Sequence, residues 1–234
     1  MILFKKKIVV TGGEGRFASV LKKTKSNYDY LFPSKKTLNI LNVNSIRKYI
    51  QKYKPKYLLH CAGLSRPMII HETNFKKSID LNIIGTANVT KICSEYNVKL
   101  IYFSTGYVYE GKIGNYKETS PILPINKYAW SKLGGECAVK LYKNSLILRI
   151  IMCEKPFLHK SAFKDIKTNF IFHEDVAKFV PKILNKKGIL NVGGKIQSVY
   201  NFAKKYNKFI KKTSGRKVFP PNPSMNITKL KKII

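Results

Sequence analysis

Acidic residues are scarce in this chain of 234 residues, where 12 aspartates and glutamates face 45 lysines and arginines and the formal net charge is +33. Such a charge could indicate a nucleic-acid or membrane-surface binder. Only five basic residues are arginines, however, and the lysines are spread along the chain instead of clustered. Because arginine makes the bidentate contacts to phosphate and guanine, we expect no specific nucleic-acid partner. The lysines favour a surface that attracts anionic ligands.

Cysteines and long apolar runs are also few. No CxxC pair and no zinc-like spacing with histidine occurs, so we expect no metal site and a reducing compartment. The four cysteines are Cys61, Cys93, Cys137 and Cys153. No apolar run approaches the ~18 residues of a membrane span, and "MILFKKKIVV" has lysines too early for a signal peptide or anchor. We therefore expect a cytoplasmic protein with no membrane partner.

Short apolar segments alternate with segments of helical periodicity. Strands are expected at "KIVV", "YDYLF", "KYLLHCAG", "VKLIYFST", "SLILRII" and "GILNV", with a helix between each pair, one of them running from about Asn74 to Tyr96. This alternation implies right-handed crossovers and a parallel sheet covered on both faces. We predict the α/β class, doubly wound as in a Rossmann fold. The main domain would span 1–151 with a last strand at 188–193, and 152–187 and 194–234 would form a small, abbreviated subdomain.

A glycine-rich turn, "TGGEGRFA", follows the first expected strand and opens a helix. Gly12 can make the tight turn, and Gly15 lets the backbone approach a pyrophosphate. The amides near Arg16 and Phe17 begin a helix whose N-terminus favours negative charge. Ala18 occupies the third position of the dinucleotide fingerprint, where alanine is accepted. A simple glycine turn is the alternative, but the strand-turn-helix context favours a dinucleotide site, which makes 1–151 an NAD(P)-binding domain.

The end of the second strand indicates which dinucleotide is bound. An acidic residue there would pair with the ribose hydroxyl of NAD, whereas basic groups accommodate the extra phosphate of NADP. This chain has Ser34, Lys35 and Lys36. We therefore expect NADP as the cofactor, with NAD possible.

The spacing Tyr-x-x-x-Lys occurs twice, about as often as expected by chance in a chain so rich in both residues. Tyr128 and Lys132 lie in "INKYAWSKLGGE", and Tyr200 and Lys204 in "SVYNFAKKY". On a helix, residues at i and i+4 share one face, so either pair could point into a cleft. The second pair lies beyond the last expected strand and is interpreted as part of an amphipathic surface helix.

Several separated blocks, in order, give the chain a resemblance to the extended short-chain dehydrogenase/reductases, and within them to the dTDP-4-dehydrorhamnose reductase branch. The blocks are "TGGEGRFA", "TLNILN", "PKYLLHCAG", "DLNIIGT", "YFSTGYVYEG", "NKYAWSKLGGE", "FIFHEDVAKFV", "GILNVGG" and "PPNPSMNITKL". Asn39 and Asn42 replace aspartates of that family, and Gly106 replaces another. Between Arg149 and "FIFHEDVA" only some 20 residues remain, about half of what the family usually has there for the sugar nucleotide.

The resemblance implies roles for residues in these blocks. Asn39 and Ile40 would line the adenine, Cys61, Ala62 and Gly63 would lie under the cofactor, and Tyr128 and Lys132 would contact it. The catalytic residues implied are Thr105, Tyr128, Lys132 and Asn82. For Asn82 the alternative is a polar helix residue with satisfied hydrogen bonds, and for Tyr128 a half-buried aromatic.

The resemblance implies the reduction of a keto group on a nucleotide-activated sugar. Hydride would come from the nicotinamide while Tyr128 protonates the oxygen, with Thr105 hydrogen-bonded to that oxygen. We expect the charge of Lys132 to lower the pKa of Tyr128 from its usual ~10. The alternatives are a nucleotide-sugar epimerase of the same superfamily and a non-catalytic NADP-binding regulatory subunit. A homodimer could form through the helices around Thr86 and Ala138.

Overall fold

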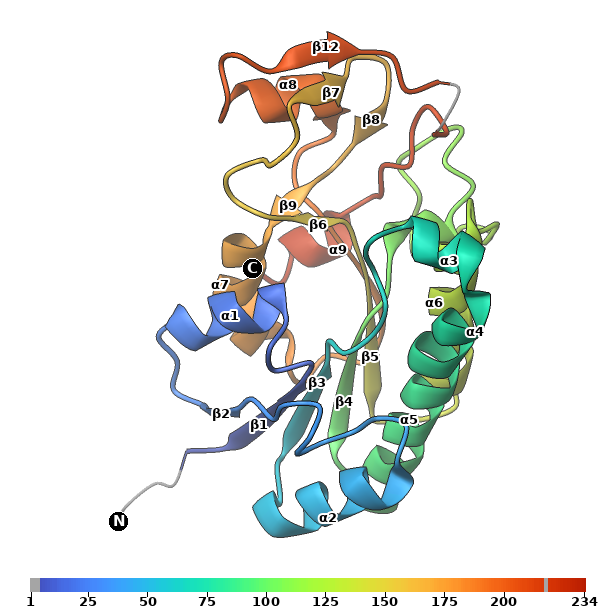
Figure 1. Cartoon of the computed structure of the whole chain (residues 1–234). Coiled ribbons are helices and arrows are strands. Elements are labelled where there is room, and N and C mark those ends of the chain that lie inside the picture. The colour runs from blue at the N-terminus through green and yellow to red at the C-terminus, as the bar shows by residue number, and fades with distance from the viewer. Residues whose placement is uncertain (1–4, 217–218) are drawn as a thin grey trace.

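The computed structural model describes residues 5–216 and 219–234, so Met1–Phe4 of the N-terminal segment and two residues of the tail lie outside the described residues. Its centre is a parallel sheet of six strands in the order β10-β5-β4-β3-β1-β2 (Figure 1). The strands are β1 (Lys7–Thr11), β2 (Asp29–Leu31), β3 (Tyr57–His60), β4 (Lys99–Phe103), β5 (Ser145–Ile150) and β10 (Gly188–Val192). Strand order reverses between β1 and β3, as in a doubly wound sheet. The predicted α/β class is confirmed.

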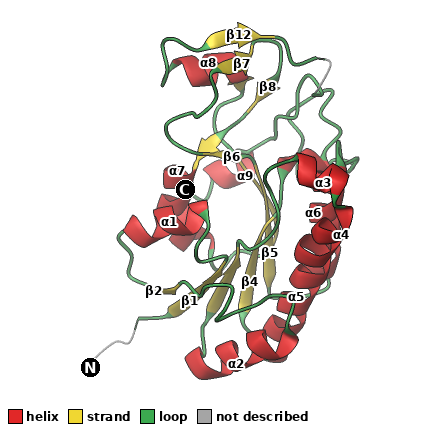
Figure 2. Cartoon of the chain, in the orientation of Figure 1, coloured by secondary structure: helices red, strands yellow, loops and turns green. Residues whose placement is uncertain are grey.

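Helices cover both faces of the sheet, as Figure 2 shows. On one face α1 (Arg16–Lys23) and α7 (His173–Ile183) pack with Ile8 and Val10, and on the other α2 (Val43–Tyr53), α5 (Gly85–Glu95) and α6 (Lys127–Lys140) pack with Val9. Successive strand side chains point to opposite faces, so one uninterrupted apolar strand supplies both cores. This explains why the strands are continuous apolar runs instead of alternating ones.

The connection from β3 to β4 differs from the single helix expected between about Asn74 and Tyr96. It consists of α3 (Ile69–Thr73), α4 (Phe75–Ser78), a π-helical turn η1 (Ile79–Ile84) and α5. A π turn inserts one residue into the helical spacing and redirects a side chain. Here it directs Asn82 into the protein, where the side chain is fully buried. The irregular turn is therefore the local structure that positions one of the predicted site residues.

A small C-terminal lobe lies beyond the carboxyl ends of the sheet strands (Figure 1). Its core contains the aromatic side chains of Phe157, Phe172 and Phe202, against which the partly buried Phe170 packs. Its elements are β6 (Met152–Cys153) paired with β9 (Ile171–Phe172), β7 (Ser161–Phe163) with β12 (Lys211–Thr213), β8 (Lys167–Thr168) with β11 (Gln197–Ser198), and α8 (Val199–Lys204). The domain division at residue 151 stays a prediction. Two helices from the segments assigned to the subdomain pack on the main sheet: α7, inside 152–187, packs into the sheet core, and α9 (Thr228–Lys231) contacts β10.

A buried ion pair connects α6 to the sheet. Arg149 on β5 donates to Glu136 on α6 at 2.8 Å, and both side chains are at most 4% exposed. Ser104 also donates to Glu136, and the guanidinium donates to the hydroxyl of Tyr109 at 3.0 Å. That hydroxyl donates to Asn191 on β10. A charge buried this deeply is tolerated only when it is paired and hydrogen-bonded.

We predict that Arg149→Met lowers the free energy of unfolding by about 3–5 kcal/mol, because it leaves the Glu136 carboxylate buried without its partner. Urea denaturation followed by circular dichroism measures this loss. Arg47→Met is the matched control, since it breaks the exposed Arg47–Glu95 pair and should change stability by less than about 1 kcal/mol. Adding Glu136→Gln to Arg149→Met should recover part of the loss. Equal effects of the two single variants would contradict this account.

Candidate active site

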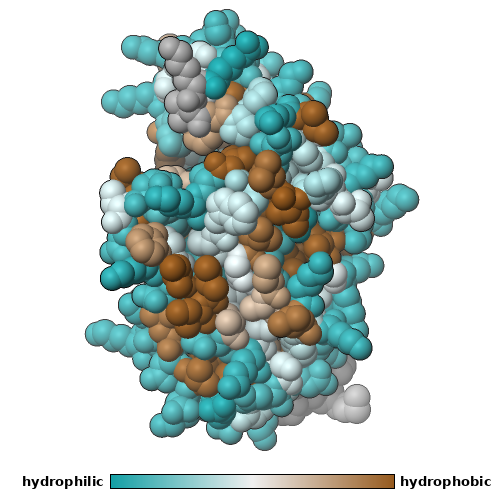
Figure 3. All heavy atoms as spheres, turned by 90° about the vertical axis from the view of Figure 1, so that its right-hand side faces the viewer, coloured by the Kyte–Doolittle hydropathy of each residue, from teal (hydrophilic) through white to brown (hydrophobic). Residues whose placement is uncertain are grey.

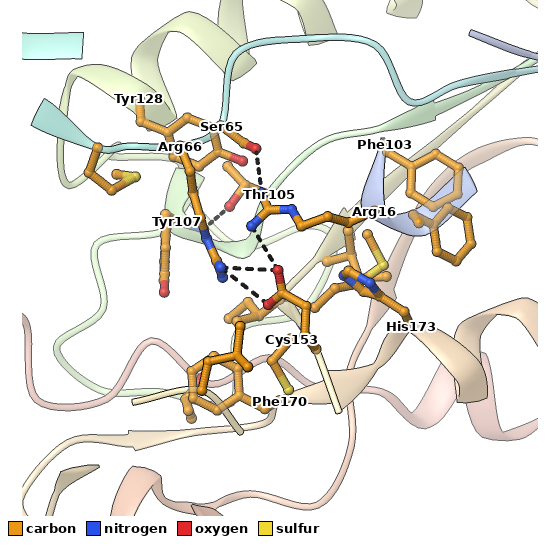
Figure 4. Close-up of a pocket in the computed structure, with 18 of the residues that line it drawn as sticks. Arg16, Ser65, Arg66, Phe103, Thr105, Tyr107, Tyr128, Cys153, Phe170 and His173 are labelled. Carbon is orange, nitrogen blue, oxygen red and sulfur yellow. Dashed lines mark hydrogen bonds and ion pairs between the residues drawn. The ribbon is translucent and has the colours of Figure 1, made fainter. Parts of the chain in front are cut away.

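A cavity of about 910 Å³ opens at the carboxyl ends of the strands, between the sheet and the C-terminal lobe (Figure 4). The loops after β1, β3 and β4, the start of α6 and the lobe all contribute to its walls. In an open parallel sheet this edge is where ligands bind. The cavity also contains most of the residues predicted from the sequence: Gly12, Gly15, Arg16, Phe17, Cys61, Gly63, Thr105, Tyr128 and Lys132.

The glycine turn is shaped by close backbone packing. Gly12 has a φ of +70°, which favours glycine, and a Cβ there would lie 3.0 Å from the backbone of Ala62. A Cβ on Gly13 would lie 2.6 Å from the carbonyl carbon of Phe32, at the end of β2. α1 then begins at Arg16, and no side chain caps its first turn. The uncapped amide groups and the helix dipole fit the pyrophosphate of a dinucleotide.

The residues predicted to select the nucleotide lie next to the turn but outside the cavity wall. Ser34 and Lys35 follow β2, and the Ser34 hydroxyl lies 3.1 Å from that of Thr37. Asn39 accepts from the amide of Leu41 at 3.0 Å, and buried Ile40 accepts from Asn88 through its carbonyl. Ser34, Lys35, Asn39, Ile40, Ala62 and Asn82 are not among the residues that line the cavity. Their contacts with a cofactor stay predictions.

Thr105, Tyr128 and Lys132 come together from two elements. Thr105 follows β4, while Tyr128 and Lys132 occupy successive turns of α6, which Asn126 caps by accepting from the Ala129 amide at 2.8 Å. The Thr105 hydroxyl accepts from the amide of Tyr107 at 3.3 Å, and it lowers the pKa of the Tyr128 phenol in part. All three line the cavity (Figure 4 labels Thr105 and Tyr128). The structure thus brings these three predicted residues to one cavity, and their catalytic roles stay predictions.

The electrostatics of the pair differ from the expectation. Burial raises the pKa of Tyr128 to about 12, although the Thr105 hydroxyl and the charges of Arg66 and Arg16 lower it in part. The predicted lowering of the Tyr128 pKa by Lys132 is wrong, because the burial of the phenol outweighs the nearby charges. Burial also lowers the pKa of Lys132 to about 8. Its ammonium lies 4.2 Å from the centre of the Tyr102 ring, a cation–π contact.

Asn82 is a connecting residue in this structure. Its amide nitrogen donates to the Leu64 carbonyl at 2.9 Å and to the Ser131 hydroxyl at 2.8 Å, and its oxygen accepts from the Leu64 amide at 2.7 Å. The side chain thus joins the loop after β3 to α6. Any part that it takes in catalysis stays a prediction, and the contacts shown indicate positioning of the helix that carries Tyr128.

Sequence reasoning missed two charged residues in the cavity, Arg66 and Glu154. Glu154 accepts from Arg66 and from Arg16, so the three form one cluster. The sequence feature that could have pointed to Arg66 is the rarity of arginine in this lysine-rich chain. Each of the five arginines makes an ion pair in the structure.

Along 5–216 and 219–234, no three histidine, cysteine, aspartate or glutamate side chains group so as to hold a metal ion. The helices of these same ranges are too short or too polar to cross a membrane.

The parallel sheet, the glycine turn and the Thr-Tyr-Lys group define a Rossmann-type protein of the short-chain dehydrogenase/reductase class. A family model described as "RmlD substrate binding domain" matches residues 6–153. The chain belongs to this family, which confirms the resemblance found in the sequence.

Curated relatives match part of the chain. It is 32% identical over 143 residues to methionine adenosyltransferase 2 subunit beta of Xenopus laevis, covering 57% of this chain and 42% of that protein. It is 28% identical over 148 residues to dTDP-4-dehydrorhamnose reductase of Aggregatibacter actinomycetemcomitans, covering 61% of this chain and 50% of that protein. The chain thus spans about half the length of the curated relatives it matches.

Solved structures confirm the fold over nearly the whole chain. A dTDP-4-dehydrorhamnose reductase from Bacillus anthracis, in complex with NADP, superposes with a TM-score of 0.88 at 23% identity, covering 99% of this chain and 93% of that one. The Bordetella bronchiseptica enzyme WbmG, in complex with NAD, superposes with a TM-score of 0.79 at 16% identity, covering 99% of this chain and 88% of that one.

We predict that Lys132→Met stabilises the protein at pH 7 by up to ~3 kcal/mol, because folding buries an ammonium whose pKa falls to about 8. Between about pH 8 and 10.5 the unfolded chain holds this proton while the folded chain does not, so wild-type stability rises with pH. The advantage of the variant should therefore shrink across that window. Urea denaturation at several pH values measures it, with Lys127→Met, an exposed lysine on the same helix, as control. A difference that stays constant with pH would contradict the prediction.

Proposed function

We propose that the protein is an NAD(P)H-dependent reductase of a keto group on a nucleotide-activated sugar, similar to dTDP-4-dehydrorhamnose reductase. The observation that carries the proposal is the convergence of Thr105, Tyr128 and Lys132 on the cavity that the glycine turn borders. The reductase names among the relatives and solved structures support it. Ser34 and Lys35 at the end of β2 favour NADP, with NAD possible.

In this mechanism the bound nicotinamide supplies the hydride, and the chain supplies the proton. With a pKa of about 12, Tyr128 carries its proton at neutral pH and can donate it to the oxygen of the reduced keto group. Thr105 donates a hydrogen bond to that oxygen as charge develops there. Lys132, with a pKa of about 8, is mostly protonated at pH 7 and stabilises the phenolate that remains.

A second candidate function is a non-catalytic NADP-binding subunit. The specific observation in its favour is the similarity to proteins named methionine adenosyltransferase 2 subunit beta. It predicts NADPH binding with no turnover on any nucleotide sugar. An epimerase, the third alternative, would return its cofactor unchanged, so net consumption of NADPH separates it from a reductase.

The cytoplasm is the proposed compartment, because the four cysteines are free.

We predict that Tyr128→Phe lowers kcat by about 10²–10⁴-fold while NADPH affinity stays nearly unchanged, because only the proton donor is lost. The assay follows NADPH oxidation with a panel of nucleotide 4-keto sugars, and fluorescence titration gives the affinity. Tyr200→Phe is the matched control, since it alters the second Tyr-x-x-x-Lys pair, on α8 outside the cavity. Full turnover by Tyr128→Phe would exclude the tyrosine as the acid. No turnover by the wild type on the whole panel would exclude the reductase.

We also propose a homodimer through the helical face formed by α3 to α6. Figure 3 shows apolar side chains gathered on this side of the molecule, and those exposed on these helices include Ile69, Phe75, Ile84 and Trp130. Thr86 itself is buried and lies 3.0 Å from the ring of His60. The contact would therefore be made by its exposed neighbours. Patches of this kind on one face are typical of protein–protein contacts.

For this dimer we predict that Trp130→Lys or Ile84→Lys gives a monomer in analytical ultracentrifugation where the wild type sediments as a dimer, because each places a charge on the apolar face. Phe209→Lys changes an exposed aromatic on the C-terminal lobe and should leave the dimer intact. A monomeric wild type, or dimeric variants, would contradict the proposed interface.

A further inference from the structure

One carboxylate in the cavity is shared by two guanidinium groups. Arg16 donates to Glu154 at 2.7 Å, and Arg66 donates to both of its oxygens at 3.1 Å; the dashed lines from the labelled arginines in Figure 4 meet on this carboxylate. The three residues come from separate segments: the start of α1, the loop after β3, and the residue after β6. The cluster therefore joins the glycine turn to the C-terminal lobe across the cavity.

The charges in this cluster do not balance. Two guanidiniums face one carboxylate, whereas Arg47 and Arg149 each have a carboxylate of their own. The excess positive charge lies beside the uncapped first turn of α1, which favours anions as well. Both guanidiniums also act on Tyr128, whose pKa they lower in part against the effect of burial. The positive potential is thus directed into the cavity.

The type and exposure of the residues point to a ligand. Arginine presents a planar fork that matches phosphate oxygens, and it is rare in this lysine-rich chain. The side chains of Arg16 and Arg66 are 48% and 43% exposed. Exposed ion pairs contribute little to stability, so the exchange of one anion for another here carries a small penalty. A diphosphate has two negatively charged groups, one for each guanidinium, where Glu154 offers a single charge.

We propose that Arg16 and Arg66 together bind the diphosphate of a ligand and that Glu154, which holds both guanidiniums in place, is displaced when that ligand binds. The proposal rests on the proposed function, because both the dinucleotide cofactor and a nucleotide sugar carry a diphosphate. Glu154 is then an internal competitor: it keeps the two arginines oriented before binding and opposes weakly charged ligands. Arg66 and Glu154 become residues that select for the phosphate-bearing part of the ligand.

The test measures binding without turnover, so it succeeds or fails independently of the reductase activity. Isothermal titration calorimetry with the full chain uses three probes: inorganic pyrophosphate, NADPH and UDP. The variants are Arg66→Gln and Glu154→Gln. Arg47→Gln is the matched control, because it removes an arginine from another partly exposed Arg–Glu pair on α2, away from the cavity. Thermal melting checks that every variant is folded.

We expect Arg66→Gln to weaken pyrophosphate binding about tenfold, as the loss of a charged hydrogen bond to phosphate would. Glu154→Gln should tighten it, and Arg47→Gln should leave it unchanged. If Arg66→Gln also weakens the binding of NADPH, the site belongs to the cofactor diphosphate. If it weakens the binding of UDP instead, the site belongs to the substrate diphosphate. Wild-type affinity of Arg66→Gln for all three probes, or no tightening by Glu154→Gln, would show that the cluster only ties the lobe to the sheet and would overturn the proposal.

Discussion

The buried ion pair between Glu136 and Arg149 is the contact on which the geometry of the site depends. Glu136 lies one helical turn beyond Lys132 on α6, and Ser104, which donates to Glu136, directly precedes Thr105. A charge that is 2% exposed cannot lose its partner without a large penalty. The position of α6 relative to β4 and β5 is therefore fixed at Glu136, next to the turn that carries Lys132. Thr105, Tyr128 and Lys132 owe their proximity to a pair that takes no part in the chemistry.

A second constraint comes from how the lobe is attached. β5 ends at Ile150, and β6 starts two residues later and pairs with β9. The lobe thus begins at the carboxyl edge of the sheet, where the ligand site lies, and it has its own aromatic core. Because the sheet and α6 already supply the floor of the cavity, a short lobe is enough to supply the remaining wall. The shortened segment after Arg149 is compatible with a cavity of about 910 Å³.

Sequence patterns predicted the sheet and most of the cavity because both follow from local rules. Apolar runs mark buried parallel strands, and parallel strands bring Gly12, Cys61 and Thr105 to one edge. The short strands of the lobe were not foreseen, because pairs of two or three residues leave no periodic signal. The π turn around Asn82 depends on hydrogen bonds to Leu64 and Ser131, which are distant in the chain. Nor could residue spacing predict the direction in which the pKa of Tyr128 shifts, because that direction depends on burial in the folded chain.

The charge of the chain has two components that act over different ranges. The lysines, spread over the whole surface, raise the local concentration of anionic ligands, and salt screens their field beyond about 8 Å at physiological ionic strength. The arginines are few and are each held by a carboxylate at a fixed place. Attraction without fixed geometry cannot discriminate among anions, whereas a planar guanidinium in a defined position can. A net charge of +33 is therefore compatible with a small nucleotide ligand: the lysines bring anions to the protein, and the arginines at the cavity decide which ones remain.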